Sequence, residues 1–204
     1  MPSLGSAATA REYLPELQGT TADSILDNVI ARVESAFAVF IGFPKADSGA
    51  FRLDQGTYTL YLDGPMWDNH EVIMLPVRPL VSVASLHSDV DRAYGSSTLI
   101  AASEYELDLP NARIIQKPNT ATVAYDRGFR ALKVVCEAGY ATGSPPAELV
   151  HAICLQTALV FRNRSNIGRE TISQQGSSVK VLSMDIHAEV RRLLYPLRAP
   201  YAVL

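Results

Sequence analysis

The stretch from 144 to 164, SPPAELVHAICLQTALVFRNR, constrains the fold most, because it predicts one long helix with a wide apolar face. Pro145 and Pro146 suit a first helical turn, where their missing N–H groups would have had no intrahelical partner, and Ser144 can cap that end. The residues of the face recur at three- and four-residue steps: Leu149, Val150, Ile153, Cys154, Thr157, Val160 and Phe161. Each fully buried Leu, Ile, Val or Phe contributes about 1.5–3 kcal/mol, so this face needs a partner.

Residues 21–42 predict a second helix that supplies this partner. Thr20 or Thr21 can cap its start, and Gly42 followed by Pro44 ends it. Its apolar residues follow the helical step: Leu26, Val29, Ile30, Val33, Phe37, Phe40 and Ile41. We therefore expect the two helices to pack on each other, with the intervening chain as a long excursion.

That excursion is rich in strand patterns. The predicted strands are 57–63, 72–75, 81–86, 105–107, 113–116 and 131–138. Pro110 and Asn111 predict a hairpin turn, and in 81–86 the alternation places Val81, Val83 and Ser85 on one face. The predicted fold class is α+β, with a helical core of two long packed helices, an inserted small antiparallel β module and an extended C-terminal arm.

The C-terminal fifth differs in character. Residues 165–182 are polar and predict an exposed loop or extended arm, with a short strand at 179–182, and Ser183 can cap a short helix. The tail beyond that helix is apolar, and such a terminus is usually held on its own body or on a neighbour. The expected division is an N-terminal extension at 1–20, a core at 21–164 and a C-terminal arm at 165–204.

Composition limits the function classes. Hydrophobic residues make up 48% and charged residues 19% of the chain, as in an ordinary soluble globular protein. The formal net charge of −3 disfavours a surface built to hold phosphates. With no signal-like start and no apolar run of bilayer length, the chain is expected to stay in the cytoplasm and to have no membrane partner. Cys136 and Cys154 are interpreted as small core residues rather than a disulfide or a metal pair.

Several pieces of the chain occur in a characteristic order. A capped helix ends in G-x-P, a strand reads Y-x-L-x-L-D-G, and the run LPVRPLVSV spans Leu75 to Val83. After the hairpin come Ala138-Gly139-Tyr140-Ala141, the proline pair and a helix that ends in R-N-R. In this order and spacing the pieces, which cover roughly Ala22 to Arg164, resemble the head-tail connector (adaptor) proteins of tailed bacteriophages.

The resemblance implies a structural role in the virion rather than an enzyme, with no cofactor. Such adaptors are made in the host cytoplasm and form a ring, usually a dodecamer, at the head-tail interface beneath the portal protein. The ring carries a stopper or tail-completion protein below and lets DNA pass. By analogy, the residues expected to dock on the portal or a neighbour are Tyr195, Leu197, Tyr201, Val203 and Leu204. Candidates for contact with the passing DNA are Arg162, Arg164, Arg169 and Lys180, which can equally be solvated charges.

Two alternatives stay open. His87, Asp89 and Asp91 lie at two-residue steps, so an extended backbone would place all three on one face, as a small metal-dependent enzyme requires. No complete metal or calcium motif accompanies them, and a charged turn after a strand explains them equally. The other alternative is a transient phage assembly chaperone, which would be absent from the finished particle.

Overall fold

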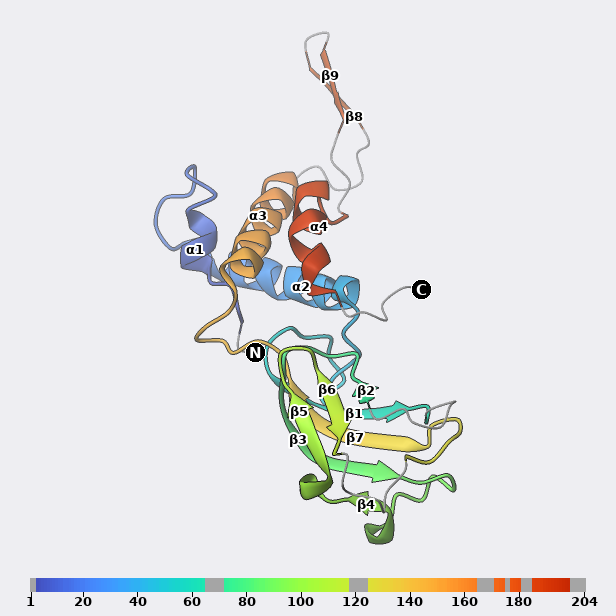
Figure 1. The fold of residues 1–204 in the computed structure, drawn as a ribbon. Coiled ribbons are helices and arrows are strands. Elements are labelled where there is room, and N and C mark those ends of the chain that lie inside the picture. The colour runs from blue at the N-terminus through green and yellow to red at the C-terminus, as the bar shows by residue number, and fades with distance from the viewer. Residues whose placement is uncertain are drawn as a thin grey trace. The chain divides into compact units, whose positions relative to one another are not determined.

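The computed structural model describes residues 3–64, 72–117, 125–164, 171–174, 177–180 and 185–198. The chain divides into two compact units. The helical unit combines the residues up to Phe37 with those from Thr142 to Arg198, and the β unit begins at Ala38 and ends at Ala141. The fold is therefore α+β, with a β-rich segment inserted between the two parts of a helical unit, as the sequence predicts (Figure 1).

The helices are α1 (Ala7–Arg11), α2 (Asp23–Ile41), α3 (Ala147–Asn163) and α4 (Ala188–Leu194), which continues into the 3₁₀ turn η4 (Tyr195–Leu197). Helix α2 ends as predicted: Gly42 has a φ of 96°, and the N–H of Phe43 donates to the carbonyl oxygen of Ala38 at 2.9 Å. Helix α3 begins later than predicted. Pro146 is its N-cap residue, and its cap has no side-chain hydrogen bond, so Ser144 does not cap it.

The core of the helical unit is more than a pair of long helices. Leu26 of α2 joins Ala158 and Phe161 of α3 in one buried cluster, but Ala7 and Leu14 of the N-terminal segment belong to the same cluster. Along its flanks α3 has α1 and α4 as backbone neighbours, and Figure 1 shows α3 between them. The predicted packing of two long helices on each other is thus not confirmed in its simple form.

The N-terminal segment is fixed by a buried carboxylate on α2. Glu34 is only 8% exposed, and its Oε1 accepts hydrogen bonds from Ser3 Oγ at 2.7 Å, Leu4 N at 2.8 Å and Gly5 N at 2.9 Å. Charge-assisted bonds to a buried acceptor are among the stronger ones in proteins. A Cβ on Gly5 would lie 2.9 Å from Cγ2 of Ile153. The segment therefore lies close against both α2 and α3.

The β unit contains two antiparallel sheets. The four-stranded sheet has the order β1-β7-β3-β4 and the three-stranded sheet the order β2-β6-β5. Their strands are β1 (Gly56–Leu62), β2 (Val72–Met74), β3 (Leu80–Ser88), β4 (Leu99–Ile100), β5 (Tyr105–Asp108), β6 (Arg113–Gln116) and β7 (Leu132–Ala138). The predicted hairpin is β5–β6, with Asp108 opposite Arg113. Buried aromatic and aliphatic side chains fill the interior, with Tyr58, Leu86 and Leu132 at 1% exposure or less.

Strand β3 departs from simple alternation. Half-buried and exposed residues alternate from Val81 to Ser85, as the sequence predicts, but the register against β7 slips between Leu80 and Ser82 and again between Val83 and Ser85. Each slip adds one residue on β3, as in a β-bulge, which bends a strand and increases its twist. The two slips explain why Ser82 and Ala84 are exposed although Leu80 and Leu86, at 3% and 0% exposure, are buried.

The LPVRPL run links the two sheets. Leu75 N donates to Ala112 O at 2.9 Å and Leu80 N donates to Leu109 O at 3.1 Å, so both ends of the run are bonded to the β5–β6 hairpin. Between them, Pro79 O accepts from Gly139 N at 2.9 Å, at the end of β7. The Arg78–Pro79 peptide bond is cis. Two sequence pieces that carry the family resemblance therefore meet directly in the structure.

Gly139 allows a close approach of two backbones. Its φ is 115°, and a Cβ built on it would lie 2.5 Å from the carbonyl oxygen of Asp54. Directly beside it, Tyr140 N donates to Leu53 O at 2.8 Å and Gln55 N donates to Tyr140 O at 3.1 Å. Only glycine combines this conformation with this proximity at little strain.

Residues 165–182 contain a short ladder that the sequence analysis interpreted as a loop or arm. Strands β8 (Thr171–Gln174) and β9 (Ser177–Lys180) pair antiparallel, with Thr171 opposite Lys180 and Gln174 opposite Ser177. The strand predicted at 179–182 thus begins earlier, and residues 181–184, including Ser183, lie outside the described residues.

The close approach at Gly139 predicts a large effect of a single methyl group. G139A should lower the free energy of unfolding by at least about 2 kcal/mol, because it adds both backbone strain and a steric clash with Asp54. The control is G143A, at a glycine with no atom within 4 Å of a built Cβ. Urea denaturation of both variants measures the difference. Equal stabilities would contradict this account of the junction.

Candidate functional site

The residues predicted to dock on a partner begin directly after α4. Tyr195 is 69% exposed, and the guanidinium of Arg198 lies 5.8 Å from its ring centroid. Leu197 is half-buried, while Tyr201, Val203 and Leu204 lie outside the described residues. Val190 and Leu194 of α4 are fully buried, so the exposed Tyr195 is carried by a well-packed helix.

A buried amide holds the chain where it enters α4. Gln156 of α3 is 5% exposed; its Oε1 accepts from His187 N at 3.0 Å and its Nε2 donates to Asp185 O at 3.3 Å. Arg191 adds an ion pair with Asp185 and a hydrogen bond from Nε to Ile186 O at 2.9 Å. These contacts fix α4, and with it the candidate docking end, on α3.

The basic residues at the end of α3 are engaged within their own chain. Arg162 binds Glu16 with two hydrogen bonds of 2.8 and 3.1 Å and donates to Tyr13 O at 3.1 Å. Arg164 lies 3.6 Å from the Phe161 ring centroid and donates to Phe161 O at 3.2 Å. Arg169 and the side chain of Lys180, the last residue of β9, lie outside the described parts.

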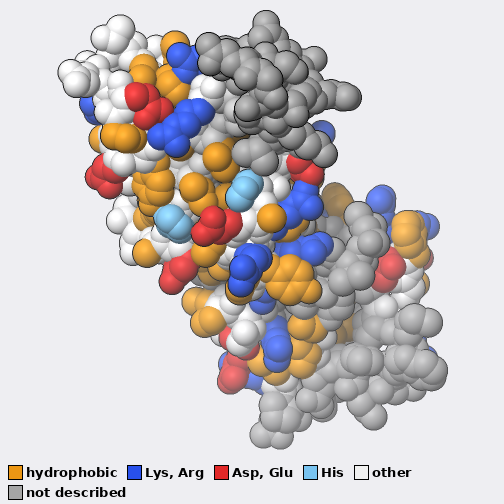
Figure 2. Space-filling model, turned by 90° about the horizontal axis from the view of Figure 1, so that it is seen from above, with side chains coloured by type: hydrophobic (Ala, Val, Ile, Leu, Met, Phe, Trp, Pro, Cys, Tyr) orange, Lys and Arg blue, Asp and Glu red, His pale blue; other side chains and the backbone are white. Residues whose placement is uncertain are grey.

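On the face that Figure 2 draws, the described Lys and Arg side chains have Asp, Glu and hydrophobic side chains near them. This mixture agrees with the formal net charge of −3. A surface that binds nucleic acid by charge alone would need clustered lysine and arginine side chains.

The proposed metal ligands are not brought together. Asp89 is 6% exposed and accepts from Asp91 N at 2.9 Å and Tyr94 N at 2.7 Å, so its carboxylate organises the turn after β3. His87 lies edge-on to Tyr94, with 6.5 Å between ring centroids. Within the described ranges, no group of three His, Cys, Asp or Glu side chains could hold a metal ion. The turn interpretation of this sequence cluster is the one that the geometry supports.

The two cysteines are buried, as the sequence predicts for small core residues. Cys136 and Cys154 are free and buried, and burial raises the pKa of their thiols to about 12 and about 11. Both are therefore small, unreactive core residues. Among the helices that the structure describes, none is long and apolar enough to cross a membrane.

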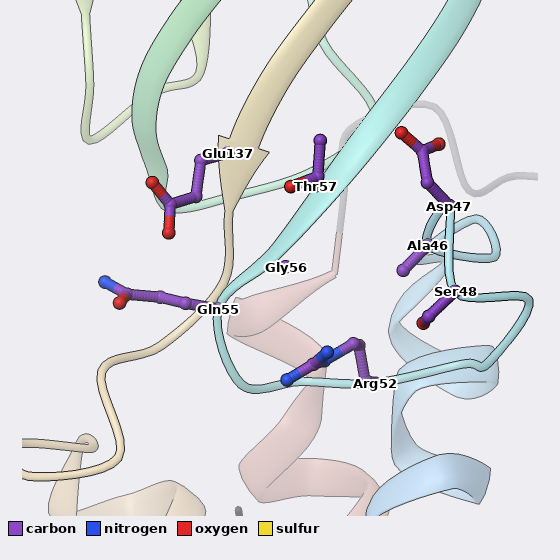
Figure 3. A pocket seen from close by; sticks show the side chains of 8 residues that line it. All are labelled: Ala46, Asp47, Ser48, Arg52, Gln55, Gly56, Thr57 and Glu137. Carbon is purple, nitrogen blue, oxygen red and sulfur yellow. The ribbon is translucent and has the colours of Figure 1, made fainter.

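A pocket of about 390 Å³ lies beside the start of β1 (Figure 3). It is lined by Ala46, Asp47, Ser48, Arg52, Gln55, Gly56, Thr57 and Glu137. Two of the three charged lining residues have structural partners: Arg52 pairs with the buried Asp54, and Asp47 accepts from Thr59 N at 2.8 Å and Thr59 Oγ1 at 2.9 Å. The pocket thus results from the way the 46–52 loop closes on β1.

An aromatic and basic cluster in the β unit, here called the β-tip patch, is not indicated by any sequence pattern. Its members are Tyr61, Tyr94, Phe129, Arg130 and Lys133. Phe129 and Tyr61 are 65% and 47% exposed. The rings of Tyr61 and Tyr94 are 5.6 Å apart, Lys133 Nζ lies 5.5 Å from the Tyr94 centroid, and the Tyr94 hydroxyl donates to Arg130 O, so the members are connected.

The backbone of the β-tip patch also stands out. Tyr94 and Arg130 have φ values of 49° and 53°, and neighbouring Arg92 has 61°. Non-glycine residues in this region cost about 1–3 kcal/mol each and cluster at functional sites. No periodic pattern marks this patch in the sequence, because its members lie on separate turns and strands. Together with its exposed apolar area, the strain marks it as a candidate contact surface.

Comparison with known proteins gives structural matches only. No protein-family model and no curated protein matches the chain. Its fold is similar to that of a chain in the neck of an empty gene transfer agent particle computed with C6 symmetry, with 17% identity and a TM-score of 0.53. It is also similar to a chain in the virion of a native gene transfer agent particle, with 21% identity and a TM-score of 0.51. Each match covers 95% of this chain and 88% of the other. These two matches show that the chain shares its fold with proteins of gene transfer agent particles.

The Glu16–Arg162 pair predicts a pH-dependent step in stability. The hydrogen bond from Arg162 lowers the pKa of Glu16 from 4.5 to about 2. The pair therefore stabilises the folded chain fully above pH 4.5, and this stabilisation is lost as the pH falls toward 2. The difference in Tm between the wild type and E16Q should be present at neutral pH and vanish by about pH 2. In an R162Q background, which lacks the donor, E16Q should give no such step, and a step of equal size with and without Arg162 would contradict the assignment.

Proposed function

We propose that this chain is a structural virion protein, a head-tail adaptor that forms a ring beneath the portal, joins the capsid to the tail and lets DNA pass. The observation that carries the proposal is the fold shared over 95% of the chain with a protein in the neck of a gene transfer agent particle. The order of the sequence motifs supports it independently. On this proposal the chain is made in the host cytoplasm, ends at the head-tail interface and has no enzymatic role.

A ring needs two different patches on each subunit that meet head to tail. The chain offers one exposed aromatic surface in each unit: the end of α4 with Tyr195, and the β-tip patch. Aromatic side chains with neighbouring arginines are the composition enriched in protein interfaces. We assign the β-tip patch to contact with a neighbouring subunit or the stopper below, in a ring of twelve.

The portal contact is assigned to the C-terminal end. Tyr195 and Leu197, together with Tyr201, Val203 and Leu204, would supply the apolar anchors. Tyr195 supports this assignment because it is largely exposed while α4 beneath it is buried on α3. A rigidly presented aromatic side chain loses little conformational entropy when a partner covers it.

DNA must pass through such a ring without being held. Each phosphate neutralised by a lysine or arginine adds salt-sensitive affinity for DNA, which would slow the passage of the DNA. The candidates for DNA contact remain Arg162, Arg164, Arg169 and Lys180. Arg162 is paired with Glu16 and Arg164 packs on Phe161. Both contacts lower the affinity of these arginines for a phosphate.

Three segments of the chain have different roles in this proposal. Residues 21–164 form the adaptor core, 1–20 an N-terminal extension and 165–204 a C-terminal arm. In this core α2 and α3 act as one support through the cluster that Leu26 shares with Ala158 and Phe161. The N-terminal residues from Ala7 to Leu14 would then stabilise the support rather than reach a partner.

Deleting Arg198 to Leu204 should reduce the retention of the protein on portal-bearing heads. Loss of even one buried apolar anchor, about 1.5 kcal/mol, lowers affinity about tenfold. Retention is measured by sedimenting heads with bound adaptor and quantifying the adaptor that remains. Y195S should act in the same direction. I25S is the matched control, since Ile25 is an exposed apolar residue of α2 at 48% exposure. Unchanged retention in the deletion variant would remove the docking assignment.

A further inference from the structure

The β8–β9 ladder is a sheet of only two strands. No other described strand pairs with either of them, so both outer edges present backbone N–H and C=O groups without a strand partner. An isolated two-stranded hairpin is marginally stable in water, and a third strand or a packed face is what stabilises it. The ladder is thus a template for a further strand.

The outer edges of the four-stranded sheet are protected, unlike those of the β8–β9 ladder. Along β1, Asp47 N donates to Thr57 O at 2.9 Å and the Asp47 carboxylate accepts from Thr59 N at 2.8 Å. These bonds occupy the outer edge of β1 with a loop of the same chain. On the other side the edge strand is β4, which has only two residues, Leu99 and Ile100. Covering an edge with a loop and keeping an edge strand very short both protect against edge-to-edge association. The described part of the chain supplies no such cover for β8 or β9.

The composition of the ladder also lacks protective features. Its eight residues are Thr171, Ile172, Ser173, Gln174, Ser177, Ser178, Val179 and Lys180. They include no proline, no acidic residue and a single charge at the end of β9, whereas edges kept single usually carry several charges or proline. The register places Ile172 opposite Val179, Thr171 opposite Lys180 and Ser173 opposite Ser178.

We propose that the outer edge of β9 pairs with the outer edge of β8 in a neighbouring copy of this chain. This inference rests on the proposed ring function and names the partner of one surface. Because β8 and β9 run antiparallel, rotation of identical hairpins about a ring axis places β9 of one copy antiparallel to β8 of the next. In every copy the edge of β9 and the edge of β8 are then both paired with neighbours, and the ring closes without an unpaired strand edge.

The dimensions suit a DNA channel. Strands lie about 4.8 Å apart in a sheet, so a closed circle of hairpins from twelve copies would be about 37 Å across between backbones. This is wide enough to surround a duplex after side chains are added.

Disulfide trapping between copies tests the pairing. Cells that produce the particles would express two single-cysteine chains together, one with T171C or S173C and the other with S178C or K180C. The four combinations cover the possible registers of such short strands. A single cysteine cannot close within its own chain, and the native Cys136 and Cys154 are buried. After oxidation of purified particles, covalent dimers are quantified on non-reducing gels, and each variant expressed alone is the control.

The expected result is a disulfide-linked dimer of the two chains in at least one combination, at least tenfold above either variant alone. If both chains are retained in the neck but no combination gives such a dimer, the strand pairing is wrong while the adaptor role stands. If dimers form equally with a single variant alone, like strands meet and the head-to-tail order is wrong. If the wild-type chain is missing from the particles, the proposed function and this inference both fail.

Discussion

The β unit depends on the approach of two backbones at Gly139. There the end of β7 is bonded to Pro79 on one side and adjoins Leu53 and Asp54 on the other. This single point connects the four-stranded sheet, the LPVRPL run and, through that run, the β5–β6 hairpin. A residue with a Cβ would force these segments apart, so glycine here determines whether the two sheets form one unit.

The helical unit depends on two buried polar side chains. Glu34 is a buried carboxylate whose Oε1 accepts three donors of the N-terminal segment, and Gln156 is a buried amide that holds the entry to α4. Buried polar groups are stabilising when their hydrogen bonds are satisfied and costly when they are not. Each of these two side chains therefore fixes a short peripheral segment on a long helix, and the segment at α4 is the one that presents Tyr195.

Much of this architecture follows from sequence periodicity. The two long helices, the β5–β6 hairpin and strands β1, β3 and β7 lie where the apolar spacing predicts them, because burial of one face decides each of them. Helix α1 was not predicted, because a helix of five residues is too short to show a periodic pattern of apolar residues. The position of the segment before it depends on hydrogen bonds to Glu34, which lies far along the chain. The bulges of β3 and the start of α3 at Ala147 depend on tertiary register and backbone geometry rather than on pattern.

The candidate contact surfaces were partly predictable. An apolar C-terminal end signals a partner by composition alone, and Tyr195 is exposed as that signal requires. The β-tip patch combines residues from β1, β7 and two turns, which only the folded sheet brings together. His87, Asp89 and Asp91 illustrate the reverse case: their spacing suits a metal site, yet the Asp89 carboxylate is used by the turn that follows it.

Each unit carries an exposed aromatic surface, the β-tip patch in one and the end of α4 with Tyr195 in the other, and the proposed adaptor role requires other subunits to cover both. An electron-microscopy reconstruction of the neck of the particle tests this most directly. The account predicts a closed ring of copies of this chain between portal and tail, with the exposed surfaces of each unit covered by other subunits. A neck in which this chain is absent, or is present without contact between copies, would contradict it.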